Sequence, residues 1–327
     1  MDLNTTKIEK SFLVIGRAGM DLYADPIGTK IEDATKFSAQ LGGSAGNIAV
    51  GLARHGCNVT LLAVISNDAI GKFTKNSLKK SGVKTNLLYE VPNRRNTLAI
   101  VDTNGENTQA VIYREAAADL LLTAELIKRV NLSEFSTIVT TGTALTKSPS
   151  QEAVLSIMKS AQELQIEIIL DIDYRAGTWG TSEKAYDILN QAGQFSSVVI
   201  GNDVEFDFMA GNNGKGQQFA ESLNKLTGKK IIYKMGSKGC ILFSNNKKTK
   251  FDTYNVEALK PTGAGDAFLA GFCASYVDES TQDDAILKGA ATAAIVVSKV
   301  GCSASIPSIA ELKKFMETHK KPALYKD

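Results

Sequence analysis

Apolar and polar positions along this chain follow two different periods. Short apolar runs rich in β-branched residues have the pattern of buried strands, and the longer stretches between them carry apolar residues at helical spacing. This alternation predicts βαβ units, and therefore an α/β fold with a mainly parallel sheet covered by helices on both faces. The predicted strands span residues 12–16, 59–65, 137–141, 166–170, 197–201 and 231–235.

The clearest helical stretch begins at Ser148. Ser148 is a typical N-cap residue, Pro149 suits the first helical position, and Gln151 completes a capping box. Apolar residues then recur at helical spacing as far as Leu164, before the next predicted strand. The sequence therefore predicts a helix that has Ser148 as its cap.

Two segments depart from this alternation. Residues 22–40 are polar and irregular, and residues 97–102 and 108–114 are alternating runs joined around Asn104-Gly105, a dipeptide typical of hairpin turns. Neither segment has the pattern of a crossover helix. We expect segments of about 22–40 and 94–116 to form a small β-rich lid on the α/β body.

Composition and charge narrow the possible functions. The 327 residues include 37 Lys+Arg and 35 Asp+Glu, for a formal charge of +2, so a broad nucleic-acid-binding or anionic-membrane surface is not expected. There are two histidines, which excludes zinc sites built on several of them. We interpret His55 as a packed helix residue, and His319 lies in a Lys-rich tail.

The cysteines and the apolar runs bear on the compartment. The four cysteines lack C-x-x-C spacing, which predicts buried free thiols in a reducing compartment. Residues 1–12 carry charges and no apolar core, unlike a signal peptide, and no run approaches the ~18 apolar residues that span a bilayer. We therefore expect a cytoplasmic protein without a membrane partner.

Charged and polar residues collect where the predicted strands end. Ligands of open parallel sheets bind beyond the carboxyl ends of the strands. The polar residues and glycines at these positions, after four different strands, are Arg17, Asp21, Asp171, Asp173, Arg175, Asn202, Glu205, Gly236 and Gly239. Their agreement predicts a ligand site at this edge of the sheet.

Two glycine motifs open helical stretches. Thr262-Gly263-Ala264-Gly265-Asp266 allows backbone N–H groups to converge at a helix N-terminus, which stabilises an anion. Asp266 then stands in the first turn, where it could accept a proton from a substrate hydroxyl. The second motif, residues 42–47, permits close backbone approach and ends in Asn47, a donor and acceptor for hydroxyls. The dinucleotide-binding and P-loop motifs are absent, which disfavours hydride transfer and P-loop hydrolysis.

Taken together, these motifs resemble the ribokinase/PfkB family of carbohydrate kinases. The family carries G-G-x-x-x-N near the N-terminus and G-A-G-D near the C-terminus, and this chain has both, with N-x-x-E between them at residues 202–205. The resemblance covers about residues 12–317 as one PfkB domain. It implies a ribokinase-like three-layer α/β fold with a mainly parallel central sheet and a small β-lid, and a homodimer formed through the lid.

The resemblance also implies the ligands and the role of each motif. It implies a phosphotransferase that uses ATP and Mg²⁺, with Asp266 as the catalytic base and the amides of Gly263, Ala264 and Gly265 as an anion hole. Asn202 and Glu205 match the element that organises Mg²⁺. The residues implied for the nucleotide are Lys234, Gly236, Gly239, Thr262 and Gly265, and those for the sugar are Asp21, Gly43 and Asn47.

One position departs from the family. The family often reads Asp-Thr-Thr before the G-A-G-D element, and that Asp helps bind a monovalent cation in some members. This chain has Lys260-Pro261-Thr262 there. Because an ammonium cannot coordinate K⁺ and can replace its charge, we expect an enzyme that does not need K⁺.

Two arginines bear on the substrate. A guanidinium binds a carboxylate in bidentate fashion, so Arg114 and Arg175 predict a sugar acid. The 2-keto-3-deoxygluconate kinases have an arginine in D-x-N-x-R, where this chain has Asp173 in place of Asn. The Asp-Tyr-Arg variant followed by Thr178-Trp179 more closely resembles the 5-dehydro-2-deoxygluconate kinases of myo-inositol breakdown, as do residues 142–150 and 16–18.

The prediction is therefore ATP-dependent phosphorylation of the C6 hydroxyl of 5-dehydro-2-deoxy-D-gluconate, with Arg175 and Arg114 facing the carboxylate. Arg175 could instead pair with Asp171 or Asp173, or contact ATP phosphates. The alternatives are a 2-keto-3-deoxygluconate kinase, a fructokinase, a nucleoside kinase and a non-catalytic sugar-binding regulator. The intact Asp266 speaks against the regulator, which would need no base.

Overall fold

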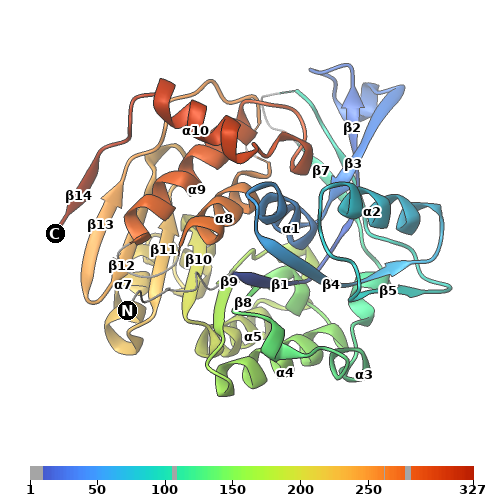
Figure 1. Ribbon diagram of the computed structural model, residues 1–327, viewed down its shortest axis with the longest axis horizontal. Helices are drawn as coiled ribbons and strands as arrows, with labels where there is room; N and C mark the ends of the chain where they lie inside the picture. Colours follow the sequence, from blue (N-terminus) through green and yellow to red (C-terminus); the bar gives the residue numbers. More distant parts are fainter. Residues whose placement is uncertain (1–9, 105–108, 261, 277–280) are drawn as a thin grey trace, which may run out of the picture.

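A large sheet forms the centre of the molecule (Figure 1). The computed structural model describes residues 10–104, 109–260, 262–276 and 281–327, and within them this sheet has ten strands in the order β14-β13-β12-β11-β10-β9-β8-β1-β4-β5. Neighbours from β11 to β5 are parallel, and the other three strands are added antiparallel at one edge. The strands are β1 (Ser11–Ile15), β4 (Asn58–Ser66), β5 (Leu88–Val91), β8 (Thr137–Thr141), β9 (Glu167–Asp171), β10 (Val198–Asn202), β11 (Lys230–Lys234), β12 (Cys240–Ser244), β13 (Lys247–Phe251) and β14 (Leu324–Lys326).

Helices cover both faces of this sheet, which confirms the predicted layered α/β fold (Figure 1). One apolar core joins the sheet to α1, α8 and α9, and the other joins it to α4, α5 and α7. Because both faces are covered, the central strands read as continuous apolar runs. The helices are α1 (Ser44–Arg54), α2 (Ala69–Lys80), α3 (Ala124–Ile127), α4 (Ser150–Glu163), α5 (Ser182–Phe195), α6 (Asp203–Met209), α7 (Gly216–Thr227), α8 (Ala264–Ser275), α9 (Gln282–Val297) and α10 (Ile309–Thr318).

The six predicted strands are present, each within one residue of its predicted bounds. The predicted start of the helix at Ser148 is wrong, because α4 begins at Ser150 and Pro149 is its N-cap residue. The amide of Gln151 donates to the carbonyl oxygen of Lys147, so it does not need the Ser148 hydroxyl. That hydroxyl donates to Glu152 instead, at 2.8 Å.

The predicted lid is a second, smaller sheet. Its described strands are β2 (Gly19–Asp25), β3 (Lys36–Gly42), β6 (Leu98–Val101) and β7 (Ala110–Tyr113), in the order β3-β2-β6-β7. Residues 22–40 were predicted to be irregular. This is correct only between β2 and β3, because both ends of the segment belong to these strands. The hairpin pairing of β6 with β7 is confirmed, while most of the predicted turn at Asn104-Gly105 lies outside the described residues.

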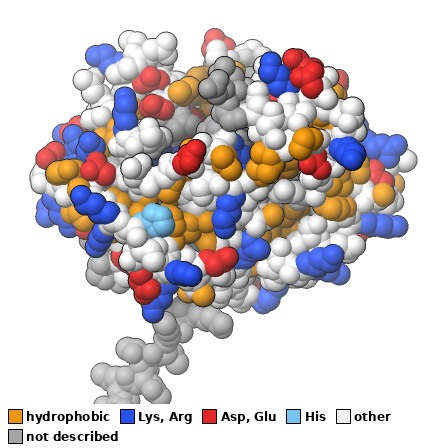
Figure 2. Space-filling model, turned by 90° about the horizontal axis from the view of Figure 1, so that it is seen from above, with side chains coloured by type: hydrophobic (Ala, Val, Ile, Leu, Met, Phe, Trp, Pro, Cys, Tyr) orange, Lys and Arg blue, Asp and Glu red, His pale blue; other side chains and the backbone are white. Residues whose placement is uncertain are grey.

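The surface carries charges of both signs, and the cysteines are not paired. On the face drawn in Figure 2, basic and acidic side chains lie interspersed, with apolar side chains exposed between them. The four cysteines are free thiols, and three of them are buried while Cys57 is partly exposed. In the part of the chain that is described, no helix is both long and apolar enough to cross a bilayer.

Candidate active site

A cavity of about 350 Å³ lies beyond the carboxyl ends of the parallel strands, under the lid. Strand ends of β9, β10 and β11, the start of α1, the start of α8 and the lid all contribute to its wall. The structure thus brings together residues that lie far apart in the sequence. The predicted site residues that line this cavity are Asp21, Gly43, Asn47, Arg175, Asn202, Glu205, Lys234, Thr262, Gly263, Gly265 and Asp266.

The two glycine motifs meet at Asp266. Gly263 is the N-cap residue of α8 with φ +85°, and a Cβ there would lie 2.6 Å from the Cys302 Sγ, so only glycine fits this turn. Asp266 stands in the first turn of α8, and Asn47 Nδ2 donates to its Oδ2 at 2.8 Å. Burial, followed by the nearby charge of Asp173, raises the pKa of Asp266 to about 7. A carboxyl group with this pKa can take up a proton near neutral pH.

A buried group of charges lies at the ends of β9, β10 and β11. Asn202 caps α6 through a capping box, in which its Oδ1 accepts from the Glu205 amide at 2.9 Å and Glu205 Oε2 accepts from the Asn202 amide at 2.7 Å. Burial and then the charge of Asp171 raise the pKa of Glu205 to about 8. Lys234 Nζ pairs with Asp171 Oδ2 at 3.2 Å. Lys234 is thus paired with Asp171, and among the described residues no ion pair involves Glu205, so a cation bound beside Glu205 would favour its ionised form.

Arg175 lies at the rim of the cavity and pairs with Asp173. Its Nε donates to Asp173 Oδ1 at 3.1 Å, and its side chain is 55% exposed. Asp173 Oδ2 accepts hydrogen bonds from the hydroxyls of Ser44 at 2.8 Å and Thr143 at 3.1 Å. Asp173 therefore orients Arg175 while it is itself held from both sides.

A second cavity, of about 640 Å³, adjoins the start of α8. Ala264 and Gly236 line it, and Lys260 contributes to its wall. The other lining residues are the small or apolar side chains Val256, Ala258, Ala293, Ala294 and Val297, together with Ser237, Thr253, Tyr254 and Asn255. The sequence did not reveal this cavity, because its apolar residues have the same pattern as ordinary core positions.

Two predicted positions lie elsewhere. Arg114 does not line either cavity: its guanidinium donates to Asp119 at 2.6 and 2.8 Å, to the carbonyl oxygen of Thr143 at 2.8 Å and to the hydroxyl of Thr146 at 3.1 Å. This buried pairing occupies its donors, and the structure does not bring Arg114 to the wall of the candidate site, where the sequence had predicted it. Gly239 packs against the backbone of Phe251, where a Cβ would overlap the carbonyl oxygen, and it does not line the second cavity either.

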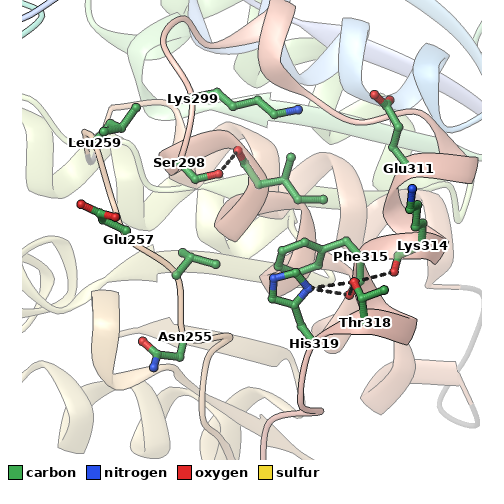
Figure 3. Close-up of a pocket in the computed structure, with 12 residues that line it drawn as sticks. Asn255, Glu257, Leu259, Ser298, Lys299, Glu311, Lys314, Phe315, Thr318 and His319 are labelled. Carbon is green, nitrogen blue, oxygen red and sulfur yellow. Dashed lines mark hydrogen bonds between the residues drawn. The ribbon is translucent and has the colours of Figure 1, made fainter.

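A third cavity, of about 740 Å³, lies between α10 and the end of α9 (Figure 3). It contains none of the residues predicted for the site. His319 stacks on Phe315 there, with ring centroids 3.8 Å apart. His55 follows α1, where burial lowers its pKa to about 4, and it does not line the candidate site.

Comparisons with known proteins agree with this arrangement. The family of pfkB carbohydrate kinases matches residues 9–309. The chain belongs to this family. It is therefore a carbohydrate kinase, and the predicted resemblance is confirmed. The match spans both glycine motifs and the lid, which is consistent with a single cavity assembled from all of them.

Relatives of this kinase and solved structures of similar fold extend the comparison. It is 32% identical to the 5-dehydro-2-deoxygluconokinase of Photobacterium profundum over 314 residues, covering 94% of this chain and 95% of that one. It is 31% identical to the enzyme of the same name from Bacillus subtilis, with 94% and 97% covered. The fold is that of an ATP-bound fructokinase from Xylella fastidiosa, with a TM-score of 0.84, 22% identity and coverage of 95% and 99%. A fructokinase from Vibrio cholerae bound to fructose, ADP and potassium has a TM-score of 0.84 at 21% identity, with 94% and 98% covered.

Proposed function

We propose that this kinase transfers the γ-phosphoryl group of ATP to the C6 hydroxyl of 5-dehydro-2-deoxy-D-gluconate, giving the 6-phosphate and ADP. The contact between Asn47 and Asp266 carries the proposal, because it joins a hydroxyl-binding residue to a carboxylate at the start of α8. The names of the relatives at about 30% identity support the sugar acid.

Asp266 is the base in this reaction. Its carboxylate takes the proton of the C6 hydroxyl as the oxygen attacks the γ-phosphorus, and the bond to the β-phosphate oxygen breaks with release of ADP. The amides of Gly263, Ala264 and Gly265 face the charge that develops on the phosphoryl oxygens. Asn47 Oδ1 is buried without a partner among the described residues, so it can accept a hydrogen bond from a sugar hydroxyl. Asp21 and Gly43 line the same wall and complete the sugar site.

The second cavity takes the adenosine part of ATP. Gly236 and Ala264 border it, and Thr262, Gly265 and Lys234 lie on the side of the first cavity, where the phosphates would pass.

Asn202 and Glu205 would hold Mg²⁺ directly or through water. The buried carboxyl of Glu205, whose pKa is raised to about 8, fits a divalent cation that compensates its charge. When bound, Mg²⁺ supplies positive charge to the phosphate oxygens.

The lid supports a homodimer. Its strands and turns expose large apolar side chains, which are rare at free surfaces of sheets. The exposed residues are Ile27, Phe37, Val111 and Tyr113. Pairing of two lids would cover them.

A cytoplasmic location, predicted from the sequence, stays a prediction.

We expect kcat/KM to fall as the pH drops below about 7, by about tenfold per pH unit. The base works only when ionised, and the pKa of Asp266 is raised to about 7, so protonation removes activity below that value. The charge of Asp173 contributes to this rise, so Asp173→Asn should shift the acidic limb of the profile to lower pH. An unshifted limb in this variant would show that another group is titrating.

We expect activity to change by less than about twofold when K⁺ replaces tetramethylammonium at constant ionic strength. The Lys260 ammonium is buried behind the anion hole, donates to the carbonyl oxygen of Thr262 and lies 3.9 Å from the Cys302 Sγ. An internal cation is therefore already present beside the motif. Strong activation by K⁺, measured as ADP release, would contradict this role of Lys260.

The acceptor is tested by ADP release from ATP·Mg²⁺ with 5-dehydro-2-deoxygluconate, 2-keto-3-deoxygluconate, fructose and ribose offered separately. We expect kcat/KM for the first to exceed the others by at least about tenfold, or about 1.4 kcal/mol of discrimination. A preference for another acceptor would retain the kinase and discard this substrate.

A further inference from the structure

Arg17 differs from the other cations of the active-site cavity. It lies in the loop after β1, lines the cavity and is 8% exposed. Its Nη1 is buried and has no hydrogen-bond partner, and among the described residues no carboxylate lies within ion-pair distance of its guanidinium. Its charge does reach Asp21, where it opposes the rise in pKa that burial causes. Among the described residues, this buried guanidinium thus has Asp21 nearby but forms no ion pair with a carboxylate.

The other two cations that line this cavity already have carboxylate partners. Lys234 pairs with Asp171, and Arg175 pairs with Asp173. Arg175 is also more than half exposed, so water screens its charge. An incoming anion would have to displace a paired carboxylate at either residue, whereas no described carboxylate is paired with Arg17.

The surroundings of Arg17 imply that its partner comes with the substrate. A buried charge without an ion-pair partner is destabilising, so such a charge is retained where a ligand supplies the counter-ion. The lid closes the cavity with Ala99, Val101, Ala110 and Ile112, whose side chains offer no hydrogen-bond acceptor. The remaining nearby acid, Asp21, is needed for a sugar hydroxyl in the proposed site.

We propose that Arg17 binds the carboxylate of the acceptor and thereby selects a sugar acid over a neutral sugar. The proposal rests on the proposed function, and it gives Arg17 the main role that the sequence had suggested for Arg114 and Arg175. A planar guanidinium matches a carboxylate in bidentate geometry, which a lysine ammonium cannot reproduce. Arg175 then lies on the phosphoryl side of the acceptor, near Asp266 and Glu205, whose charges it feels.

The test compares Arg17→Gln and Arg17→Lys with the matched variant Arg175→Gln. The measured quantity is the ratio of kcat/KM for 5-dehydro-2-deoxygluconate to kcat/KM for fructose, together with the KM for ATP. We expect Arg17→Gln to lower this ratio by about 100-fold, with the KM for ATP changed less than about twofold. Arg17→Lys should recover part of the loss, and Arg175→Gln should change the ratio by less than about fivefold. A larger change in Arg175→Gln than in Arg17→Gln would overturn the proposal.

A thermal-shift measurement separates this proposal from the proposed reaction. Without ligand, Arg17→Gln should unfold at the same or a higher temperature than the wild type, because an unpaired buried charge is removed. Added 5-dehydro-2-deoxygluconate should raise the Tm of the wild type and not that of Arg17→Gln. Equal shifts in both proteins would overturn the role of Arg17. No turnover of the sugar acid, with a Tm shift that depends on Arg17, would instead reject the proposed reaction and keep the anion site.

Discussion

Asp266→Asn is expected to lower kcat by about 10²- to 10⁴-fold, the usual range for the loss of a positioned base. The amide has the shape of the carboxylate and can still accept the hydrogen bond that Asn47 Nδ2 donates at 2.8 Å, but it cannot take up the proton of the acceptor hydroxyl. The kcat is measured by ADP release, and the Kd of the sugar acid by calorimetry. Binding should be retained, because the side chain keeps its place at the start of α8.

The control for this variant is Asp187→Asn, which changes an exposed carboxylate on α5 away from the cavity. It should leave kcat unchanged. A loss of less than about tenfold in Asp266→Asn would show that proton transfer to Asp266 is not part of the slow step.

Arg114→Ala is expected to lower the free energy of unfolding by about 3–5 kcal/mol. The variant leaves Asp119 as a buried charge without its partner, since the two side chains are 9% and 2% exposed and their atoms lie 2.6 Å apart. It also removes the donors that reach Thr143 and Thr146. Urea denaturation followed by circular dichroism measures the change.

Arg95→Ala serves as the matched control, because Arg95 pairs with Asp68 at the surface with 83% of its side chain exposed. That pair should contribute less than about 1 kcal/mol. Arg114→Lys keeps the charge and gives a milder variant if the alanine variant does not fold. If Arg114→Lys raised the KM of the sugar acid without loss of stability, the substrate role suggested by the sequence would be restored.

Local patterns predicted the body of the fold well. Most of the strands were found because burial on both faces makes them apolar runs, as in residues 12–15 of β1. The bounds of the lid strands β2 and β3 were not predicted, because neither strand is a continuous apolar run and the first four residues of β3 are all exposed. The cap of α4 was misassigned because the Lys147 carbonyl oxygen, which no side-chain pattern reveals, takes the amide of Gln151.

At the candidate site, too, the sequence predicted some features and the fold decided others. Motif chemistry identified Asp266, Asn47 and the glycines at the start of α8, since nests, caps and close backbone approach depend on residue types at short spacing. The partner of a charged side chain depends instead on the fold, both for residues distant in sequence, such as Asn47 and Asp266, which are 219 positions apart, and for near neighbours such as Asp173 and Arg175.

The alternation of apolar and helical patterns therefore predicted an α/β fold with a site at the carboxyl ends of the strands, and the resemblance of the motifs to a known family predicted a carbohydrate kinase. The three-dimensional arrangement assigned its arginines: Arg114 to a buried pair with Asp119, Arg175 to Asp173, and Arg17 to no carboxylate among the described residues. It also raised the pKa of Asp266 to about 7 through burial. Pairing and desolvation depend on distances between atoms and on burial in the folded chain, which the order of residue types does not specify.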